Sequence, residues 1–135
     1  MSEDKVILVV EDEQPLLEAI RLKLDKNNFK VVTARSVEQA KQYVIDLAQV
    51  DAIWLDHYLL GKEDGLDFVA WCKEGDNAKC KNIPVFVVSN TASHDKVASY
   101  LQLGIKEYFV KSNYRLDEII ATIIECLEGK IDCPK

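Results

Sequence analysis

A chain of 135 residues, 48% of them hydrophobic, is long enough to bury one core and too short for two ordinary domains. The net charge of −6 argues against nucleic acid or an anionic membrane as the main partner, because both need a basic surface. The sequence shows neither a signal-peptide pattern nor an apolar run of about 18 residues. We therefore expect one cytoplasmic domain within residues 1–135, with a core over about 4–128 and a short tail at 129–135.

Taken from the N-terminus, short apolar runs alternate with stretches whose apolar residues recur every three or four positions. The runs are typical of strands and occupy residues 5–10, 29–34, 51–56, 83–89 and 106–110. The other stretches are typical of amphipathic helices, with apolar residues at Leu16, Ile20 and Leu24, at Ala40, Val44 and Ala48, at Val97 and Leu101, and at Leu116, Ile119, Ile120, Ile123, Ile124 and Leu127. The pattern predicts five strands alternating with five helices.

Residues that start and stop helices agree with this reading. Pro15 suits the first turn of a helix, Ser36 and Gln39 have capping-box spacing, and Gly104 stands where the fourth helix should end. Strands made of continuous Val and Ile runs are typical of a parallel sheet covered by helices on both faces. Right-handed crossovers then leave few topologies, and we predict a doubly wound α/β sandwich.

Polar side chains stand at the ends of four predicted strands. In chain order they are Glu11 and Asp12, then Asp56, then Ser89, then Lys111. Ligands of doubly wound sheets bind beyond the carboxyl ends of the strands, so these side chains should lie together. Each has an ordinary structural explanation alone, but four coincidences at one edge favour a functional site.

Three carboxylates at one edge repel one another, since two unit charges about 4 Å apart cost roughly 4 kcal/mol at an effective dielectric near 20. A hard divalent cation such as Mg2+ suits this cluster, because it takes oxygen ligands and needs only a few carboxylates. Asp56 could then attack a phosphoryl group whose oxygens contact the cation, Lys111 and Ser89. The pattern predicts a site that accepts phosphate.

The chain resembles the response-regulator receiver domain of two-component signalling. The resemblance lies in "VILVVEDE" with its acid pair, the Asp that ends the third strand, a turn that closes in Asp64-Gly65, a hydroxyl after the fourth strand, and "GIKEYFVKS", which is similar to the family's Gly-x-x-x-Tyr-x-x-Lys-Pro segment. It covers nearly the whole chain.

The resemblance implies a flavodoxin-like (βα)5 fold with strand order 2-1-3-4-5. It implies that Asp56 accepts a phosphoryl group from a histidine kinase or histidine phosphotransfer protein, which makes the chain a signalling module rather than an enzyme. Glu11 and Asp12 are expected to hold Mg2+ together with Asp56 and the backbone carbonyl of Tyr58.

By the same resemblance, Ser89 and Lys111 contact the phosphoryl group and Tyr108 is the switch residue. We expect phosphorylation to draw in Ser89 and let Tyr108 turn inward. The surface of the fourth helix, fifth strand and fifth helix should then change its binding to a kinase, a phosphotransfer protein or a second copy. Output through a partner suits a receiver that no output domain follows, unless the chain is a fragment.

Two departures from the family pattern lead to further predictions. Ser112 stands where the family has a proline whose preceding peptide bond is typically cis. A cis bond before another residue costs roughly 3–4 kcal/mol, but strain is tolerated at functional sites, and we predict cis for Lys111–Ser112. Tyr58 is bulkier than most residues at its place, and we expect its ring to slow hydrolysis of the phosphorylated state.

The cysteines and histidines give less information about function. The four cysteines lack the paired close spacing of structural zinc sites, and in a reducing cytosol we expect four free thiols, at Cys72, Cys80, Cys126 and Cys133. His57 follows Asp56 directly, and as a strand neighbour its side chain should point the other way.

Two other functions remain open. A receiver-like module could dock a partner without accepting phosphate, although mutually repelling carboxylates argue against a pure docking surface. A metal-dependent phosphatase could use Asp56 as a transient nucleophile. The best-known enzymes of that kind resemble an Asp-x-Asp pattern, and Tyr58 fills the second acidic place here.

Overall fold

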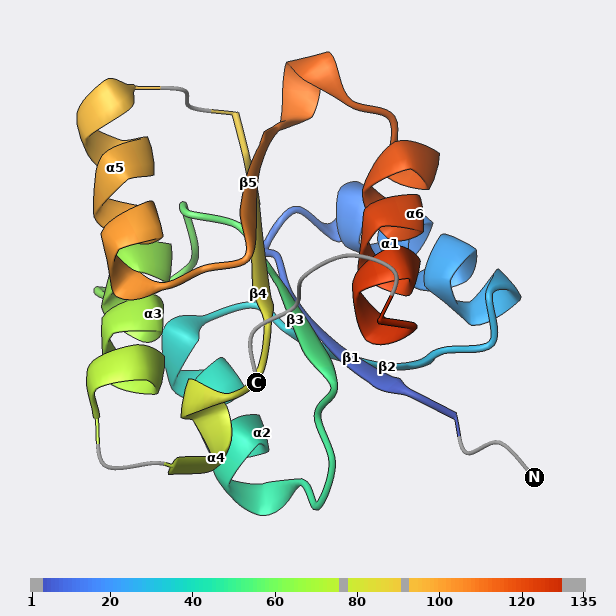
Figure 1. The fold of residues 1–135 in the computed structure, drawn as a ribbon, viewed down its shortest axis with the longest axis horizontal. Helices are drawn as coiled ribbons and strands as arrows, with labels where there is room; N and C mark the ends of the chain where they lie inside the picture. The colour runs from blue at the N-terminus through green and yellow to red at the C-terminus, as the bar shows by residue number, and fades with distance from the viewer. Residues whose placement is uncertain (1–3, 76–77, 91–92, 130–135) are drawn as a thin grey trace.

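The computed structural model describes residues 4–75, 78–90 and 93–129. These residues form one sheet with helices on both faces (Figure 1). The elements in chain order are β1 (Val6–Val10), α1 (Gln14–Lys26), β2 (Lys30–Ala34), α2 (Val37–Asp46), β3 (Ala52–Leu55), α3 (Gly65–Glu74), α4 (Ala78–Lys81), β4 (Val85–Ser89), α5 (His94–Leu103), β5 (Glu107–Val110), the 3-10 turn η1 (Lys111–Asn113) and α6 (Leu116–Leu127). Among the helices of these ranges, none has both the length and the apolar character that a bilayer crossing requires.

The five strands pair in parallel in the order β2-β1-β3-β4-β5, which confirms the predicted doubly wound fold. The inner strands β1, β3 and β4 are apolar and almost completely buried, as expected where helices cover both faces. Figure 1 shows α1 and α6 on one face and α2, α3 and α5 on the other. An apolar core fills each of the two interfaces.

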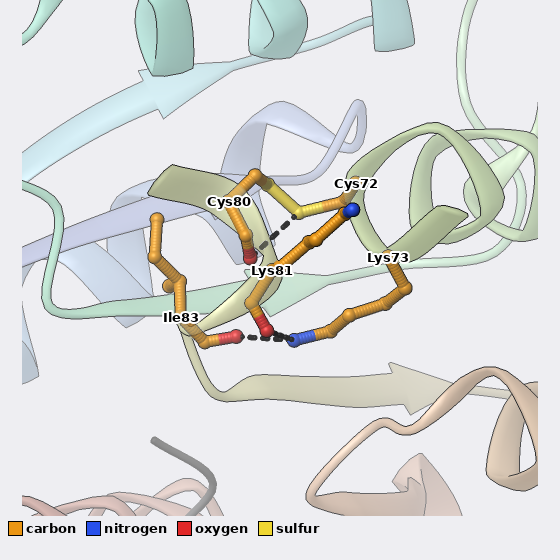
Figure 2. Close-up of a disulfide and its surroundings, with 5 residues drawn as sticks. All are labelled: Cys72, Lys73, Cys80, Lys81 and Ile83. Carbon is orange, nitrogen blue, oxygen red and sulfur yellow. Dashed lines mark hydrogen bonds between the residues drawn. A yellow bond between two sulfur atoms is a disulfide. The ribbon is translucent and has the colours of Figure 1, made fainter. Parts of the chain in front are cut away.

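The connection from α3 to β4 differs from the prediction. It contains the one-turn helix α4, so the described ranges hold six α-helices instead of five. Cys72 in α3 and Cys80 in α4 form a disulfide with their Cα atoms 5.1 Å apart (Figure 2). The ammonium of Lys73 donates hydrogen bonds to the carbonyl oxygens of Lys81 at 3.1 Å and Ile83 at 2.8 Å. Together these contacts fix α4 against the end of α3.

The prediction of four free thiols is therefore wrong. Cys72 and Cys80 are bonded to each other, and Cys126 is not a free thiol either. Cys133 lies outside the described residues. A separation of eight residues is no disulfide signal in a sequence, because only the turn through α4 brings the two side chains within bonding range.

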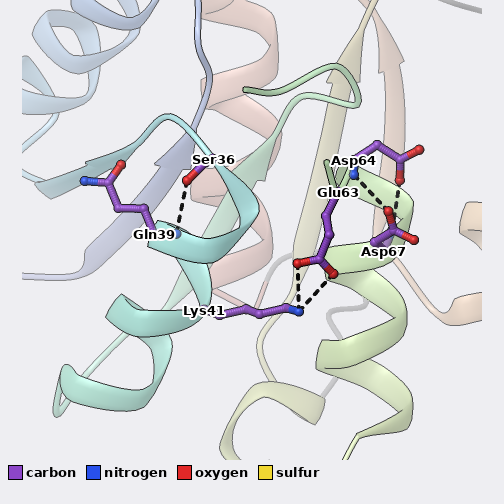
Figure 3. Close-up of polar contacts among 6 residues, drawn as sticks. All are labelled: Ser36, Gln39, Lys41, Glu63, Asp64 and Asp67. Atoms are coloured by element: carbon purple, nitrogen blue, oxygen red, sulfur yellow. Dashed lines mark hydrogen bonds and ion pairs between the residues drawn. The ribbon is translucent and has the colours of Figure 1, made fainter. Parts of the chain in front are cut away.

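Three predicted helix signals can be compared with the structure. Pro15 lies in the first turn of α1, and Gly104 ends α5 in the left-handed conformation at φ +97°, both as predicted. Ser36 caps α2, because its hydroxyl accepts a hydrogen bond from the Gln39 amide at 3.2 Å (Figure 3). The Gln39 side chain accepts from the amide of Arg35 instead of that of Ser36, so the predicted capping box is only half formed.

The start of α3 is held more tightly. Asp64 and Asp67 form a reciprocal capping box, in which each carboxylate accepts from the other residue's amide, at 3.0 and 2.9 Å (Figure 3). Just before it, Glu63 pairs with Lys41 of α2 at 3.1 Å. These contacts fix the far end of the loop that begins after β3.

Candidate functional site

The buried polar and charged residues of the described chain gather at one edge of the sheet. They are Glu11, Asp56, His57 and Ser89, with exposed fractions between 0% and 6%. All four stand at the carboxyl ends of β1, β3 and β4. Since buried charges are costly unless they are paired, this edge is where a function is expected to compensate the cost.

Strand pairing brings the acids together. Val10 and Leu55 are register partners in β1 and β3, and the ladder continues as the Asp56 amide donates to the Val10 carbonyl at 2.9 Å. One carboxylate oxygen each from Glu11, Asp12 and Asp56 lies within 4.8 Å of the others. Asp12 is half-exposed, so the cluster opens to solvent on its side.

Lys111 reaches the same cluster from the far strand. Its ammonium lies 3.0 Å from a Glu11 oxygen and 3.4 Å from Asp56 Oδ2, and its side chain is 15% exposed. The described residues contain no cis peptide, so the prediction of a cis Lys111–Ser112 bond is wrong. The chain instead turns through η1 directly after β5, and a trans backbone in that turn aims the amine at the acids.

Charge repulsion and burial show in the pKa values. Burial, and then the nearby Asp56, raise the pKa of Glu11 to about 7. Burial also raises the pKa of Asp56, although Lys111 opposes it. Burial alone would lower the pKa of Lys111, but the Asp56 and Glu11 carboxylates outweigh it and raise that pKa. One ammonium thus faces three carboxylates, which leaves a deficit of positive charge.

This donor set fits a hard divalent cation. The three acids offer only oxygen ligands, and the half-exposed side of the cluster leaves room for the waters that Mg2+ retains. A second positive charge would also relieve the repulsion that raises the pKa of Glu11.

Ser89 and Tyr108 lie together beside the cluster. Ser89 ends β4 fully buried, and Tyr108 of β5 is half-buried. Burial raises the pKa of Tyr108, and a side-chain hydrogen bond with Ser89 opposes the shift. The two residues predicted to act as a switch are thus already in contact when Asp56 carries no phosphoryl group.

Sequence reasoning missed the surroundings of His57. Its Nδ1 lies 2.7 Å from the hydroxyl of Tyr100 on α5. Its Nε2 lies 3.6 Å from Asp64 Oδ2. Tyr100 fell between the apolar positions counted for its helix, so periodicity gave no signal for the contact.

Comparisons with known proteins were made for the whole chain. The family model of the response regulator receiver domain matches residues 7–124. Among curated relatives, the phosphate regulon transcriptional regulatory protein PhoB of Klebsiella pneumoniae is 31% identical over 117 residues, which cover 87% of this chain and 49% of that protein. The chain thus spans about half, or less, of the length of the curated relatives it matches.

Solved structures give the same fold. The phosphorylated cyanobacterial phytochrome response regulator RcpA superposes with a TM-score of 0.82 at 27% identity, covering 98% of this chain and all of that one. The Mn2+-bound form of the response regulator Rcp1 superposes with a TM-score of 0.79 at 24% identity, covering 97% of this chain and 99% of that one. Such domains are signalling modules of phosphorylation-based two-component systems rather than classical enzymes. With its family match, its strand order and its acidic edge, the chain belongs to the response regulator receiver domain family.

Proposed function

We propose that Asp56 accepts a phosphoryl group from a histidine kinase or a histidine phosphotransfer protein, and that residues 4–128 act as one receiver domain. One observation carries the proposal: a buried carboxylate lies within 3.4 Å of the Lys111 ammonium and beside two further acids. RcpA, a relative in fold and sequence, is described as phosphorylated, which supports the same chemistry here.

The proposed transfer step uses groups at the carboxyl ends of the strands. A carboxylate oxygen of Asp56 forms the new bond to phosphorus while the phosphorus–nitrogen bond to the donor histidine breaks. Lys111 and the Ser89 hydroxyl lie at the neighbouring strand ends, from where they contact the equatorial phosphoryl oxygens. Lys111 supplies a positive charge and Ser89 supplies a hydrogen-bond donor where negative charge builds up on the phosphoryl oxygens.

Mg2+ is the proposed cofactor. Glu11, Asp12 and Asp56, which offer carboxylate oxygens within 4.8 Å of one another, would hold it together with the backbone carbonyl of Tyr58. When bound, the ion neutralises the acids and the incoming phosphoryl oxygens. Without it, Asp56 remains beside negative neighbours that repel a phosphoryl donor.

Output should leave through the surface formed by α5, β5 and α6. Tyr108 in β5 joins this surface to Ser89, so a change at Asp56 has a short path outward. A partner can respond only if it binds the two states with different affinity. We propose a kinase, a phosphotransfer protein, a downstream protein or a second copy as that partner.

Intact-mass measurement tests the proposal. The full chain is incubated with Mg2+ and a small acyl phosphate, and the wild type should gain the mass of one phosphoryl group. Asp56→Asn should gain none, and chelation of the metal should suppress the gain in the wild type. A wild type that stays unmodified with Mg2+ and several donors would favour a docking module that acts without phosphorylation.

A further inference from the structure

The buried imidazole of His57 links three segments around the acidic cluster. It belongs to the loop directly after Asp56, its Nδ1 lies 2.7 Å from Tyr100 Oη on α5, and its Nε2 lies 3.6 Å from Asp64 at the start of α3. His57 is 5% exposed and Tyr100 is fully buried. The two buried polar groups therefore satisfy each other's need for a hydrogen bond. Two apolar side chains at these positions would pack without needing a partner.

The direction of this hydrogen bond follows from burial. Burial raises the pKa of Tyr100, so the phenol keeps its proton and has one to donate to the imidazole 2.7 Å away. The Tyr100 hydroxyl then donates to Nδ1, and the remaining ring proton on Nε2 faces the Asp64 carboxylate. A single tautomer accounts for both contacts.

The backbone of the same residue is tied to the acceptor. The His57 amide donates to Asp56 Oδ1 at 2.8 Å, and its carbonyl accepts from the Gly65 amide at 2.8 Å. A Cβ on Gly65 would come within 2.5 Å of Tyr100 Oη and 2.7 Å of the Asp56 carbonyl oxygen. One close-packed unit is thus formed by the phosphoacceptor Asp56, the loop after it, the start of α3 and the Tyr100 hydroxyl.

The ring of Tyr100 also packs against that of Tyr108, the expected switch residue. The rings of Tyr100 and Tyr108 have centroids 5.6 Å apart at a 55° tilt, and Tyr108 bonds Ser89. A chain of hydrogen bonds therefore runs from Asp56 through His57 to Tyr100 on α5. The ring of Tyr100 then contacts Tyr108, which is hydrogen-bonded to Ser89.

We propose that the His57–Tyr100 hydrogen bond is a positioning contact that couples the phosphorylation state of Asp56 to α5. The inference rests on the proposed function. Phosphorylation changes the charge and the partners of the carboxylate that accepts the His57 amide, so it shifts the loop that carries the imidazole. Because Tyr100 is bound to that imidazole, α5 follows.

The test compares single-atom deletions. Tyr100→Phe removes only the hydroxyl, and Tyr43→Phe is its matched control, since Tyr43 is a partly buried tyrosine of α2 that packs against the same core. Phosphate uptake is first measured by intact mass, and amide chemical shifts of α5 are then followed with and without acyl phosphate and Mg2+. Uptake by Tyr100→Phe should match the wild type, while the factor by which phosphorylation changes the α5 equilibrium constant should fall about fivefold, as loss of one buried hydrogen bond implies. Tyr43→Phe should show the full response.

A second pair of variants guards against a merely structural effect. His57→Leu removes the hydrogen-bond acceptor Nδ1. His57→Asn keeps a side-chain oxygen close to the place of Nδ1, and that oxygen can accept the hydrogen bond from Tyr100. The α5 response, expressed per phosphorylated molecule, should be lost in the first and largely kept in the second. An unchanged α5 response in phosphorylated Tyr100→Phe, or equal losses in both His57 variants, would overturn the coupling and leave phosphorylation intact. A wild type that takes up no phosphate would overturn the proposed function and this inference with it.

Discussion

The ionisation of Glu11 depends on its burial and on the charge of the neighbouring acids. Burial and Asp56 raise its pKa from 4.5 to about 7. A pKa that is higher in the folded state means that the folded chain binds more protons than the unfolded chain between these values. Stability without a divalent cation should therefore decrease as the pH rises from about 4.5 to about 7.

Replacing Glu11 by a neutral isostere tests this reading. Without divalent cations above pH 7, Glu11→Gln should raise the free energy of unfolding by roughly 1–3 kcal/mol, because the buried charge is removed. Saturating Mg2+ should shrink or reverse that difference, since the wild type then gains from its full ligand set. Chemical denaturation at several pH values measures both effects. Glu13→Gln, at an exposed neighbour, serves as control, and a Glu11→Gln protein less stable than the wild type above pH 7 would contradict the account.

Tyr58 should set the lifetime of the phosphorylated state. Its ring is 57% exposed beside the acceptor, and the Lys96 ammonium donates to its hydroxyl at 3.0 Å. This contact holds a large side chain near the path of water to the phosphorus, so Tyr58→Asn should lose its phosphate several-fold faster. The loss is followed by intact mass after the donor is removed. Tyr114→Asn, at another exposed tyrosine, should be unaffected, and equal rates for Tyr58→Asn and the wild type would count against the idea.

At the scale of elements, the start of α3 is the tightest junction near the site. Gly65→Ala should destabilise the fold by about 1–3 kcal/mol through overpacking, and it should also slow phosphate uptake, because the new methyl group meets Asp56 and Tyr100. Gly104→Ala makes a contrast, since its Cβ would meet nothing within 4 Å and only the left-handed backbone is strained, at about 1–2 kcal/mol. Thermal melts and uptake rates are compared. Normal uptake by Gly65→Ala would show that this junction does not position the acceptor.

The disulfide between α3 and α4 should contribute to stability. Closing a loop of eight residues lowers the entropy of the unfolded chain by an amount worth about 2–3 kcal/mol. Reductant should therefore lower the free energy of unfolding of the wild type more than it lowers that of the double variant Cys72→Ser/Cys80→Ser. The two decreases should differ by about 2–3 kcal/mol. If reductant affects both proteins equally, the Cys72–Cys80 bond adds nothing.

Sequence reasoning did better with elements than with the contacts between them. Continuous apolar runs were enough to predict the five strands, and Pro15 and Gly104 marked the ends of two helices, whereas the strand order came from the family resemblance. The helix α4 was missed because a single turn has no periodicity to detect. The prediction of four free thiols was wrong because the Cys72–Cys80 bond depends on how the chain turns through α4. The prediction of a cis Lys111–Ser112 bond was wrong because position 112 lacks the proline that makes a cis bond inexpensive.

The candidate site shows the same division. Parallel strands end at one edge, so the sequence could indicate that Glu11, Asp12, Asp56 and Lys111 would meet, and the structure does place them together. The His57–Tyr100 contact could not be foreseen, because it joins residues 43 apart whose types are ordinary for a turn and a helix.

At the scale of the whole molecule, a closed core on each face of the sheet leaves one polar edge as the place for chemistry. The net charge of −6 argues against nucleic acid as the direct partner, and we propose that the signal passes by protein contact. The α5–β5–α6 surface lies next to the switch pair and is the natural exit. Phosphorylation at Asp56 is therefore the central claim on which the partner and coupling proposals depend.

Peptide mapping of the phosphorylated chain tests that claim most directly. The chain is first treated with a small acyl phosphate donor and Mg2+. Borohydride reduction then converts the aspartyl phosphate on the protein to homoserine. The chain is digested and sequenced by tandem mass spectrometry. If Asp56 is the phosphoacceptor, homoserine should appear at position 56 and at no other acidic residue, with none formed when Mg2+ is chelated. Modification at Glu11 or Asp12 instead, or a fully loaded protein with Asp56 unchanged, would contradict it.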